Sequence, residues 1–315
     1  MRIINLIENT DGNNGCEFAH GLSFYIETGK HKILVDLGPS DLTTRNAEII
    51  GIDLDAVDIV ILSHGHYDHS GGIIPFSKIN SHATIYMQKT ALGEYYSDDG
   101  KDKDEDRYRY IGVDKTIGDL PQVKLIDGDY EIDDELSLFV IKKREEKVPF
   151  TNGRLKEKKG SSYVQDEFEH EHYLVIRDDD RRILVSGCAH NGIVNIIKEY
   201  KKRYSSEPDA VISGFHLMKK GEYTDDELGE IIDTAKELKK YRTMFYTCHC
   251  TGVSAFEVMK NIMGDHLEYV HCGDEVKVQY YSKRRRDSFM KLHKFFAWAT
   301  VACFLMTMFT GYKKQ

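Results

Sequence analysis

The chain has 315 residues, of which 41% are hydrophobic and 30% charged, and its formal net charge is -9. This composition is ordinary for a soluble globular protein with a sizeable core, and the acidic balance argues against non-specific nucleic-acid binding. The six cysteines show no disulfide-like spacing, and the N-terminus has no apolar signal-peptide core. We therefore expect a cytoplasmic protein whose thiols are reduced.

The first part of the chain alternates short apolar runs with turn signals. Their length and their β-branched residues are typical of strands. Four such runs are predicted strands: 21–28, 31–38, 57–64 and 83–88. Between them, residues 40–52 are predicted to form a helix with Ser40 or Asp41 as its N-cap.

Two polar stretches occupy the middle of the chain. Residues 97–110 (SDDGKDKDEDRYRY) and residues 148–172 carry so many charges that we expect exposed loops. Residues 173–187 (YLVIRDDDRRILVSG) then predict a β-hairpin, because two apolar runs flank a charged turn.

The remainder alternates helices and strands. Helices are predicted at 192–204, 224–240 and 254–263, and strands at 209–214 and 243–249. Thr224 and Glu227 have the spacing of a capping box at the start of the second of these helices. Hairpins followed by strand–helix units indicate an α/β fold of two sheets packed face to face with helices outside.

The C-terminal residues 283–315 differ from the rest. A basic segment (KRRRDSFMKLHK) precedes the uncharged residues 295–312, which as a helix would rise about 27 Å and approach the thickness of a bilayer core. The basic flank would keep the main body cytoplasmic. We therefore predict a domain at 1–282 and, at 283–315, a basic linker with an apolar tail that could anchor the protein to a membrane. A core-docked or amphipathic terminal helix is the alternative.

A cluster of metal-ligand side chains follows the strand predicted at 57–64. The motif HGHYDH holds His64, His66, Asp68 and His69 within six positions. Residues two apart on an extended chain point the same way, so His64 and His66 can share one ion, while the turn presents Asp68 and His69 to a neighbouring position. Two metal ions about 3.5–4 Å apart can be held in this way.

Further candidate ligands stand where later predicted strands end. These are Cys188 and His190 in SGCAHNG, His216 in SGFHL, and His249 in YTCHCTG. Loops at one edge of a sheet commonly carry the chemistry of such scaffolds, so we expect these side chains to complete the site. Cys248 and Cys250 flank His249 and are expected to point into the core if the segment is extended.

These motifs resemble the metallo-β-lactamase superfamily, and more closely its subgroup similar to the archaeal dihydropterin synthase of methanopterin biosynthesis. The resemblance rests on HxHxDH, on ILVDLG before it, and on HGLSFYIET, YIGV, FEHEHYLVI, SGCAHNGIVNI, GFHL and HCTG. It extends from about residue 2 to about residue 280. It implies an αββα sandwich of two mixed sheets with a dinuclear zinc site at one edge, Mn²⁺ or Fe²⁺ being alternatives.

By position, the resemblance implies that His64 and His66 bind the first metal, and that Asp68, His69 and His249 bind the second. Other positions are less determined. Asp36 in LVDLG would orient a ligand imidazole or only cap a turn. Cys188 stands where the superfamily usually has a bridging Asp, and is either a thiolate ligand or a buried free thiol. The third ligand of the first metal is His190, with His170 or Glu171 as alternatives. His216 and His20 would contact substrate or support the ligands.

The expected function is metal-dependent hydrolysis of an ester, thioester, lactone or phosphoester, with a small anionic substrate. Asp68 would hold the nucleophile, and His216 or His190 would serve as general acid. His66 stands where a diiron relative typically has Glu, which favours zinc. Two alternatives remain: a pterin-type condensing synthase that releases pyrophosphate, and a non-catalytic, membrane-tethered ligand sensor.

Overall fold

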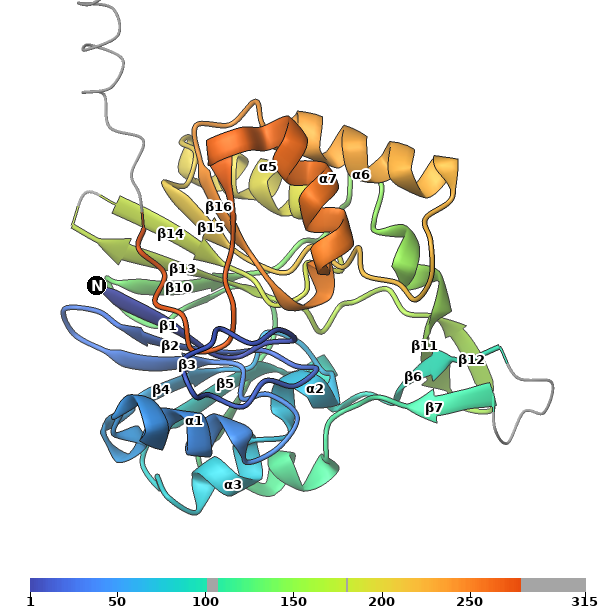
Figure 1. The fold of residues 1–315 in the computed structure, drawn as a ribbon. Helices are drawn as coiled ribbons and strands as arrows, with labels where there is room; N and C mark the ends of the chain where they lie inside the picture. The colour runs from blue at the N-terminus through green and yellow to red at the C-terminus, as the bar shows by residue number, and fades with distance from the viewer. Residues whose placement is uncertain (101–106, 180, 279–315) are drawn as a thin grey trace, which may run out of the picture. The chain divides into compact units, whose positions relative to one another are not determined.

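A computed structural model of the chain describes residues 1–100, 107–179 and 181–278 (Figure 1). The predicted linker and apolar tail at 283–315 lie outside the described residues, so the membrane anchor and the domain boundary at 282 stay predictions. Within the described ranges, no helix combines the length and the hydropathy needed to span a bilayer.

The first sheet has six strands in the order β1-β2-β3-β4-β5-β8. Strands β1, β2 and β3 are antiparallel neighbours, whereas β3, β4, β5 and β8 run parallel, so the sheet is mixed. Its strands are β1 (Arg2–Ile7), β2 (Ser23–Glu27), β3 (Lys32–Val35), β4 (Ile59–Ile61), β5 (Thr84–Gln88) and β8 (Val123–Ile126). Its helices are α1 (Leu42–Ile50), α2 (Tyr67–Ser70) and α3 (Ile73–Ser77). Helix α1 begins after Asp41, one of the two predicted caps.

The second sheet has seven strands in the order β17-β16-β15-β14-β13-β10-β9 and is also mixed. Its strands are β9 (Tyr130–Glu131), β10 (Leu136–Phe139), β13 (Tyr173–Asp178), β14 (Arg181–Val185), β15 (Ala210–Ile212), β16 (Met244–Thr247) and β17 (Leu267–Tyr269). Its helices are α5 (Ile193–Tyr204), α6 (Asp225–Leu238) and α7 (Val253–Met263). The predicted hairpin is confirmed as the antiparallel pair β13–β14, and both bonds of the Thr224–Glu227 capping box are present.

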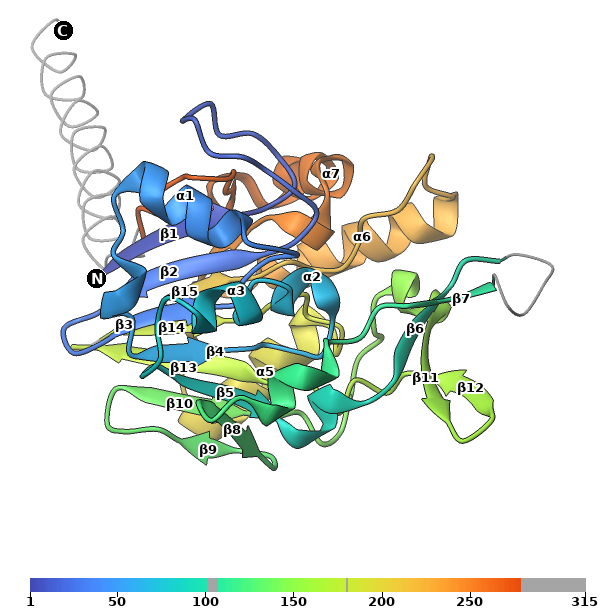
Figure 2. The ribbon, with the colours of Figure 1, turned by 90° about the horizontal axis from the view of Figure 1, so that it is seen from below.

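Apolar side chains alternate along the strands and divide the core into layers. Phe24 of β2 and Leu174 of β13 belong to the cluster between the two sheets, whereas Val60 of β4 and Val175 of β13 face outward into the layers beneath the helices. Helices α1 and α3 cover one outer face and α5–α7 the other (Figures 1 and 2). The predicted αββα sandwich is therefore confirmed.

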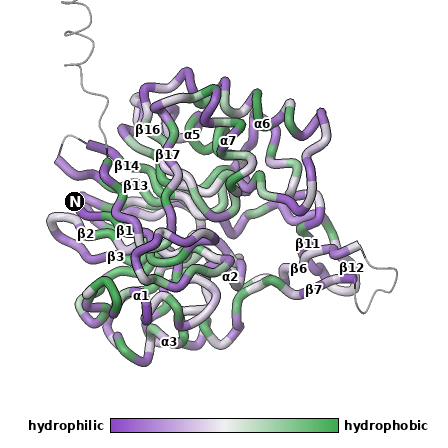
Figure 3. The backbone as a smooth tube through the Cα atoms, in the orientation of Figure 1, coloured by the Kyte–Doolittle hydropathy of each residue, from purple (hydrophilic) through white to green (hydrophobic). Residues whose placement is uncertain are grey.

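A third, four-stranded antiparallel sheet extends from the sandwich as an arm (Figures 1 and 2). It consists of β6 (Tyr95–Asp98), β7 (Tyr108–Tyr110), β11 (Leu155–Lys159) and β12 (Ser162–Gln165). The prediction of loops at 97–110 and 148–172 was therefore wrong for these strands. Figure 3 shows that the arm is mostly hydrophilic, and this polar composition is the reason that the sequence predicted loops here. Backbone hydrogen bonds pair the strands, and tyrosines pack across the sheet: Tyr108 of β7 and Tyr163 of β12 stack with ring centres 3.8 Å apart.

Short 3₁₀ turns complete the connections. They are η1 (Leu54–Ala56), η2 (Lys89–Leu92), η3 (Lys115–Asp119), η4 (Phe150–Arg154), η5 (His249–Thr251) and η6 (Gly264–His266). Two of them position the candidate site: η4 leads into the arm, and η5 carries His249 directly after β16.

Candidate metal centre

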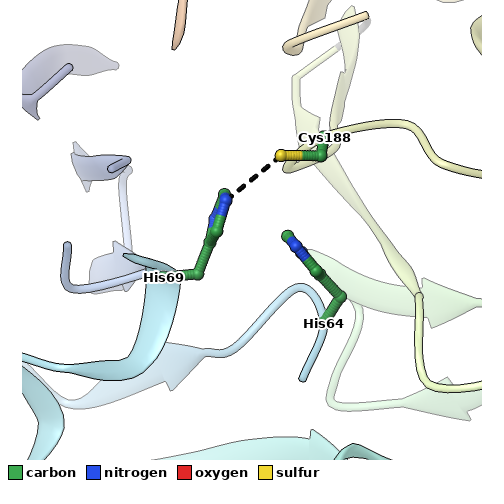
Figure 4. Close-up of side chains that lie close together, drawn as sticks. All are labelled: His64, His69 and Cys188. Carbon is green, nitrogen blue, oxygen red and sulfur yellow. Dashed lines mark hydrogen bonds between the residues drawn. The ribbon is translucent and has the colours of Figure 1, made fainter. Parts of the chain in front are cut away.

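The predicted ligands converge where β4, β14 and β16 end. The ring centres of His64 and His190 lie 4.9 Å apart, although 126 positions separate them in the sequence, and those of His69 and His249 lie 5.0 Å apart. Figure 4 shows Cys188 facing His64 and His69, which lie five positions apart in the HGHYDH motif. The fold therefore brings the HGHYDH cluster together with Cys188, His190 and His249, which the sequence marked only as isolated strand-end residues.

The donor atoms fall into small groups in which each atom lies within 4.8 Å of the others. One group contains only imidazoles, and the others add a carboxylate or thiols. They are His64–His66–His190, His64–His69–Cys188, Cys188–His249–Cys250, His20–Asp68–His249 and His66–Asp166–His170. All of these residues except His20 are buried.

One buried carboxylate sets the tautomers of His64 and His69. Ser63 Oγ donates to Asp36 Oδ2 at 2.7 Å, so Ser63 Oγ accepts the hydrogen bond from His64 Nδ1 at 2.8 Å. Asp36 Oδ2 also accepts from His69 Nδ1 at 2.7 Å. Each neutral imidazole therefore carries its proton on Nδ1 and keeps a lone pair on Nε2. This geometry agrees with the orienting role considered for Asp36.

Two asparagines act in the same way on His190 and His249. Asn152 Oδ1 accepts from His190 Nδ1 at 3.1 Å, and Asn9 Oδ1 accepts from His249 Nδ1 at 2.9 Å. The asparagine amides donate to the backbone carbonyls of the same two histidines, which fixes which amide atom is the oxygen. The sequence analysis missed Asn9, Asn152 and Ser63; the two asparagines lie 240 and 38 positions from their partners, so no local pattern could reveal them.

The remaining ring nitrogens are buried and lack a hydrogen-bond partner among the described residues. These atoms are Nε2 of His64, His66, His190 and His249. A buried polar atom left unpaired costs about 1–3 kcal/mol, so several together need an explanation. Burial lowers the pKa of His66 to about 3 and that of His249 to about 4, which keeps both imidazoles neutral. Neutral imidazoles with free, convergent lone pairs fit a metal ion.

The alternatives to His190 have their lone pairs engaged. His170 Nδ1 accepts the backbone N–H of Gly65 at 3.0 Å, so its Nε2–H faces Asp166 at 3.1 Å and no ring lone pair is left. Glu171 Oε1 accepts the backbone N–H of His190 at 2.7 Å, and its Oε2 accepts further hydrogen bonds. The geometry therefore favours His190 as the partner of His64 and His66.

Asp68 faces several imidazoles. Its Oδ2 lies 3.4 Å from Nε2 of both His249 and His20, and 3.8 Å from His69 Nε2. Burial opposes ionisation, but the charge on the adjacent His69 imidazole and the contact with His249 outweigh it and hold the Asp68 pKa well below its ordinary value. Asp68 is therefore a carboxylate at neutral pH.

Two cysteines, Cys188 and Cys250, lie at the centre, whereas only Cys188 was expected there. Cys188 Sγ lies 3.2 Å from His69 Nε2. Cys248 packs between the sheets as predicted, but Cys250, also expected in the core, lines the cavity beside Cys188 and His249. The reason is the turn η5: His249 has a φ of 47°, so the chain is not extended there and its side chains do not alternate.

A cavity of about 70 Å³ opens beside the donor atoms. His216 and His20 line it together with His66, Asp68 and His190. The Thr151 hydroxyl donates to the backbone carbonyl of His216, so its oxygen accepts from His216 Nδ1 at 2.7 Å. Neutral His216 therefore has its lone pair on Nε2, which makes it a proton acceptor.

Comparisons with known proteins indicate the family and the fold. The family model described as "Metallo-beta-lactamase superfamily" matches residues 17–197. A Methanocaldococcus jannaschii protein named 7,8-dihydropterin-6-methyl-4-(beta-D-ribofuranosyl)-aminobenzene-5'-phosphate synthase is 31% identical over 298 residues, which cover 88% of this chain and 96% of that protein. The crystal structure of Tm1679, described as a metal-dependent hydrolase of the beta-lactamase superfamily, has a TM-score of 0.73 and 29% identity, covering 89% of this chain and 99% of that one. Zn(2+)-bound PqqB from Methylobacterium extorquens has a TM-score of 0.51, but at 14% identity, covering 88% of this chain and 100% of that one, it shows only the shared fold.

Proposed function

The chain belongs to the metallo-beta-lactamase superfamily, and we propose that it is a metal-dependent hydrolase with a dinuclear zinc centre. The observation that supports this most directly is the set of four buried Nε2 atoms that have no partner among the described residues. The similarity to Tm1679, described as a metal-dependent hydrolase, supports it further. The expected substrate is an ester, thioester, lactone or phosphoester.

In this proposal His64, His66 and His190 hold the first ion. The second ion is held by a carboxylate, two imidazoles and a thiolate: Asp68, His69, His249 and Cys188. Imidazole and thiolate donors suit zinc better than they suit manganese. Ions bound there would lower the pKa of water to about 7 and stabilise negative charge that develops on the substrate.

The chain's own groups would orient water and move protons. Asp68, held ionised, can accept a hydrogen bond from the attacking water and so fix its direction. His216 can take a proton on Nε2 and return it to the leaving group, because Thr151 keeps the other ring nitrogen protonated. His190 is a weaker candidate for this proton transfer, since its Nε2 lies in the imidazole group of His64 and His66.

The test combines metal analysis with a substrate panel. Purified protein is measured for bound metal and assayed with a phosphodiester, a phosphomonoester, a lactone and a thioester. His66→Ala should lose bound metal and all hydrolysis, because one of three imidazoles at the first position is removed. His82→Ala, at an exposed histidine, is the matched control and should behave like the unmodified protein. Full activity in His66→Ala would rule out the proposal.

A second candidate is a pterin-type condensing synthase that releases pyrophosphate. The observation that favours it is the 31% identity to a protein named as a dihydropterin synthase over nearly its whole length. Incubating the protein with a pterin pyrophosphate and an aminobenzene ribofuranosyl phosphate separates the two reactions. Pyrophosphate release that requires the second reactant indicates condensation, whereas release without it indicates hydrolysis.

A further inference from the structure

The cavity beside the metal-ligand side chains is walled partly by the arm. Besides the ligands, it is lined by Ser97 of β6, Arg109 of β7 and Leu155 of β11. Arg154, the last residue of η4, also lines it. Two positively charged side chains, Arg109 of the arm and Arg154 of the turn that leads into it, therefore reach the place where the proposed substrate binds.

These two arginines differ in their partners. Arg109 Nε binds Asp99 Oδ2 at 3.1 Å in an exposed ion pair, which contributes little to stability and can be exchanged for a ligand. For Arg154, no carboxylate lies within ion-pair distance among the residues that the structure describes. Asp68 is the only acidic side chain among the described residues that line the cavity, and it faces imidazoles instead. Arg154 is thus an exposed guanidinium without an internal counter-charge.

The chemistry of the guanidinium indicates what it would bind. Its planar fork donates two parallel hydrogen bonds to an oxyanion, and phosphoryl groups match this geometry. The cavity volume of about 70 Å³ corresponds to roughly two water molecules, so it accepts one small group while the rest of the substrate lies outside. A phosphoryl group placed there would contact Arg154 while adjoining the imidazole donors.

We infer that Arg154 binds a phosphoryl group of the substrate beside the metal centre, and hence that the substrate is a phosphorylated small molecule. Arg109 contributes a second positive charge to the same group. The inference specifies the substrate class of the proposed function. It rests on that function at one point, because it takes this cavity as the substrate site.

The test measures binding of inorganic phosphate by calorimetry to the full-length, zinc-loaded protein and to three variants. Arg154→Ala should weaken binding about 10- to 100-fold, the loss of a charge-assisted contact. Arg154→Lys, which keeps the charge but not the fork, should fall between. Lys156→Ala removes the same charge on the same segment outside the cavity and should bind as the unmodified protein does.

Three results would overturn the inference: equal phosphate binding by Arg154→Ala and the unmodified protein, an equal loss in Lys156→Ala, or displacement of phosphate by acetate at matched concentration. The last result would indicate a carboxylate site. Metal content, measured on the same samples, decides the proposed function separately. A protein that binds no metal refutes the zinc centre, whereas the comparison of Arg154→Ala with the unmodified protein can still be made without metal.

Discussion

Asp36→Asn is the substitution that tests the candidate centre most sharply, because it changes one atom and no volume. Asp36 is fully buried and accepts three hydrogen bonds of 2.7 Å: from the Ser63 backbone N–H, from Ser63 Oγ and from His69 Nδ1. An asparagine that keeps its oxygen on the Ser63 N–H turns its amide protons toward the other two donors. His69 would then have to place its proton on Nε2, the atom that faces Cys188.

The magnitude follows from the bond that is lost. A hydrogen bond to a charged group contributes about 1.5–3 kcal/mol, which corresponds to roughly 10- to 100-fold in zinc affinity. Supporting residues of metal sites show losses of about this size. The assay is competition for zinc against a chromogenic chelator, with circular dichroism to verify folding. Asp119→Asn, at an exposed position, is the control. Unchanged zinc affinity in folded Asp36→Asn would refute the assigned tautomers.

Two further predictions concern stability and the tail. His31 lies 2.5 Å from Asp58 and 2.7 Å from Asp133, and although burial acts in the opposite direction, these carboxylates raise its pKa above 6.5. The stabilising effect of protonated His31 is therefore complete below about pH 6.5 and is lost as pH rises through the raised pKa. The difference in melting temperature between the unmodified protein and His31→Ala should therefore shrink in alkaline buffer. A difference that grows with pH would contradict this. Deleting residues 283–315 should preserve solubility, metal content and activity, because every residue of the donor groups lies between His20 and Cys250; an insoluble or inactive truncation would show that the tail belongs to the fold.

The sandwich was predictable because its signals are local. Apolar alternation marks β2 and β13, the capping box marks the start of α6, and the charged turn marks the β13–β14 hairpin. The strand-end positions of Cys188 and His249 followed from these elements. The arm was not predictable by the same means, since its strands bury few aliphatic side chains and depend on tyrosines that meet only after distant segments pair.

The choice among ligands needed hydrogen bonds that no sequence pattern contains. His170 and His190 both adjoin strands of the second sheet, and the sequence preferred His190 without excluding His170. What separates them is whether Nδ1 donates or accepts: Asn152 Oδ1 accepts from His190, whereas the Gly65 N–H donates to His170. Whether a histidine ring can bind a metal ion therefore depends on whether its Nδ1 donates or accepts a hydrogen bond. In both cases the hydrogen-bond partner lies far away in the sequence.

The two halves of the centre should respond differently to pH when they take up metal. At the first position burial lowers the pKa of His64, His66 and His190, so these imidazoles are already neutral and release no proton near pH 7. At the second, burial and then Cys250 raise the pKa of the Cys188 thiol well above its ordinary value, so ligation must displace a proton. Affinity for the second ion should therefore increase about tenfold per pH unit while that for the first stays constant. Calorimetric zinc titrations in buffers of different ionisation enthalpy count the released protons. Equal proton release at both steps, or none in the second, would mean that Cys188 is not a ligand.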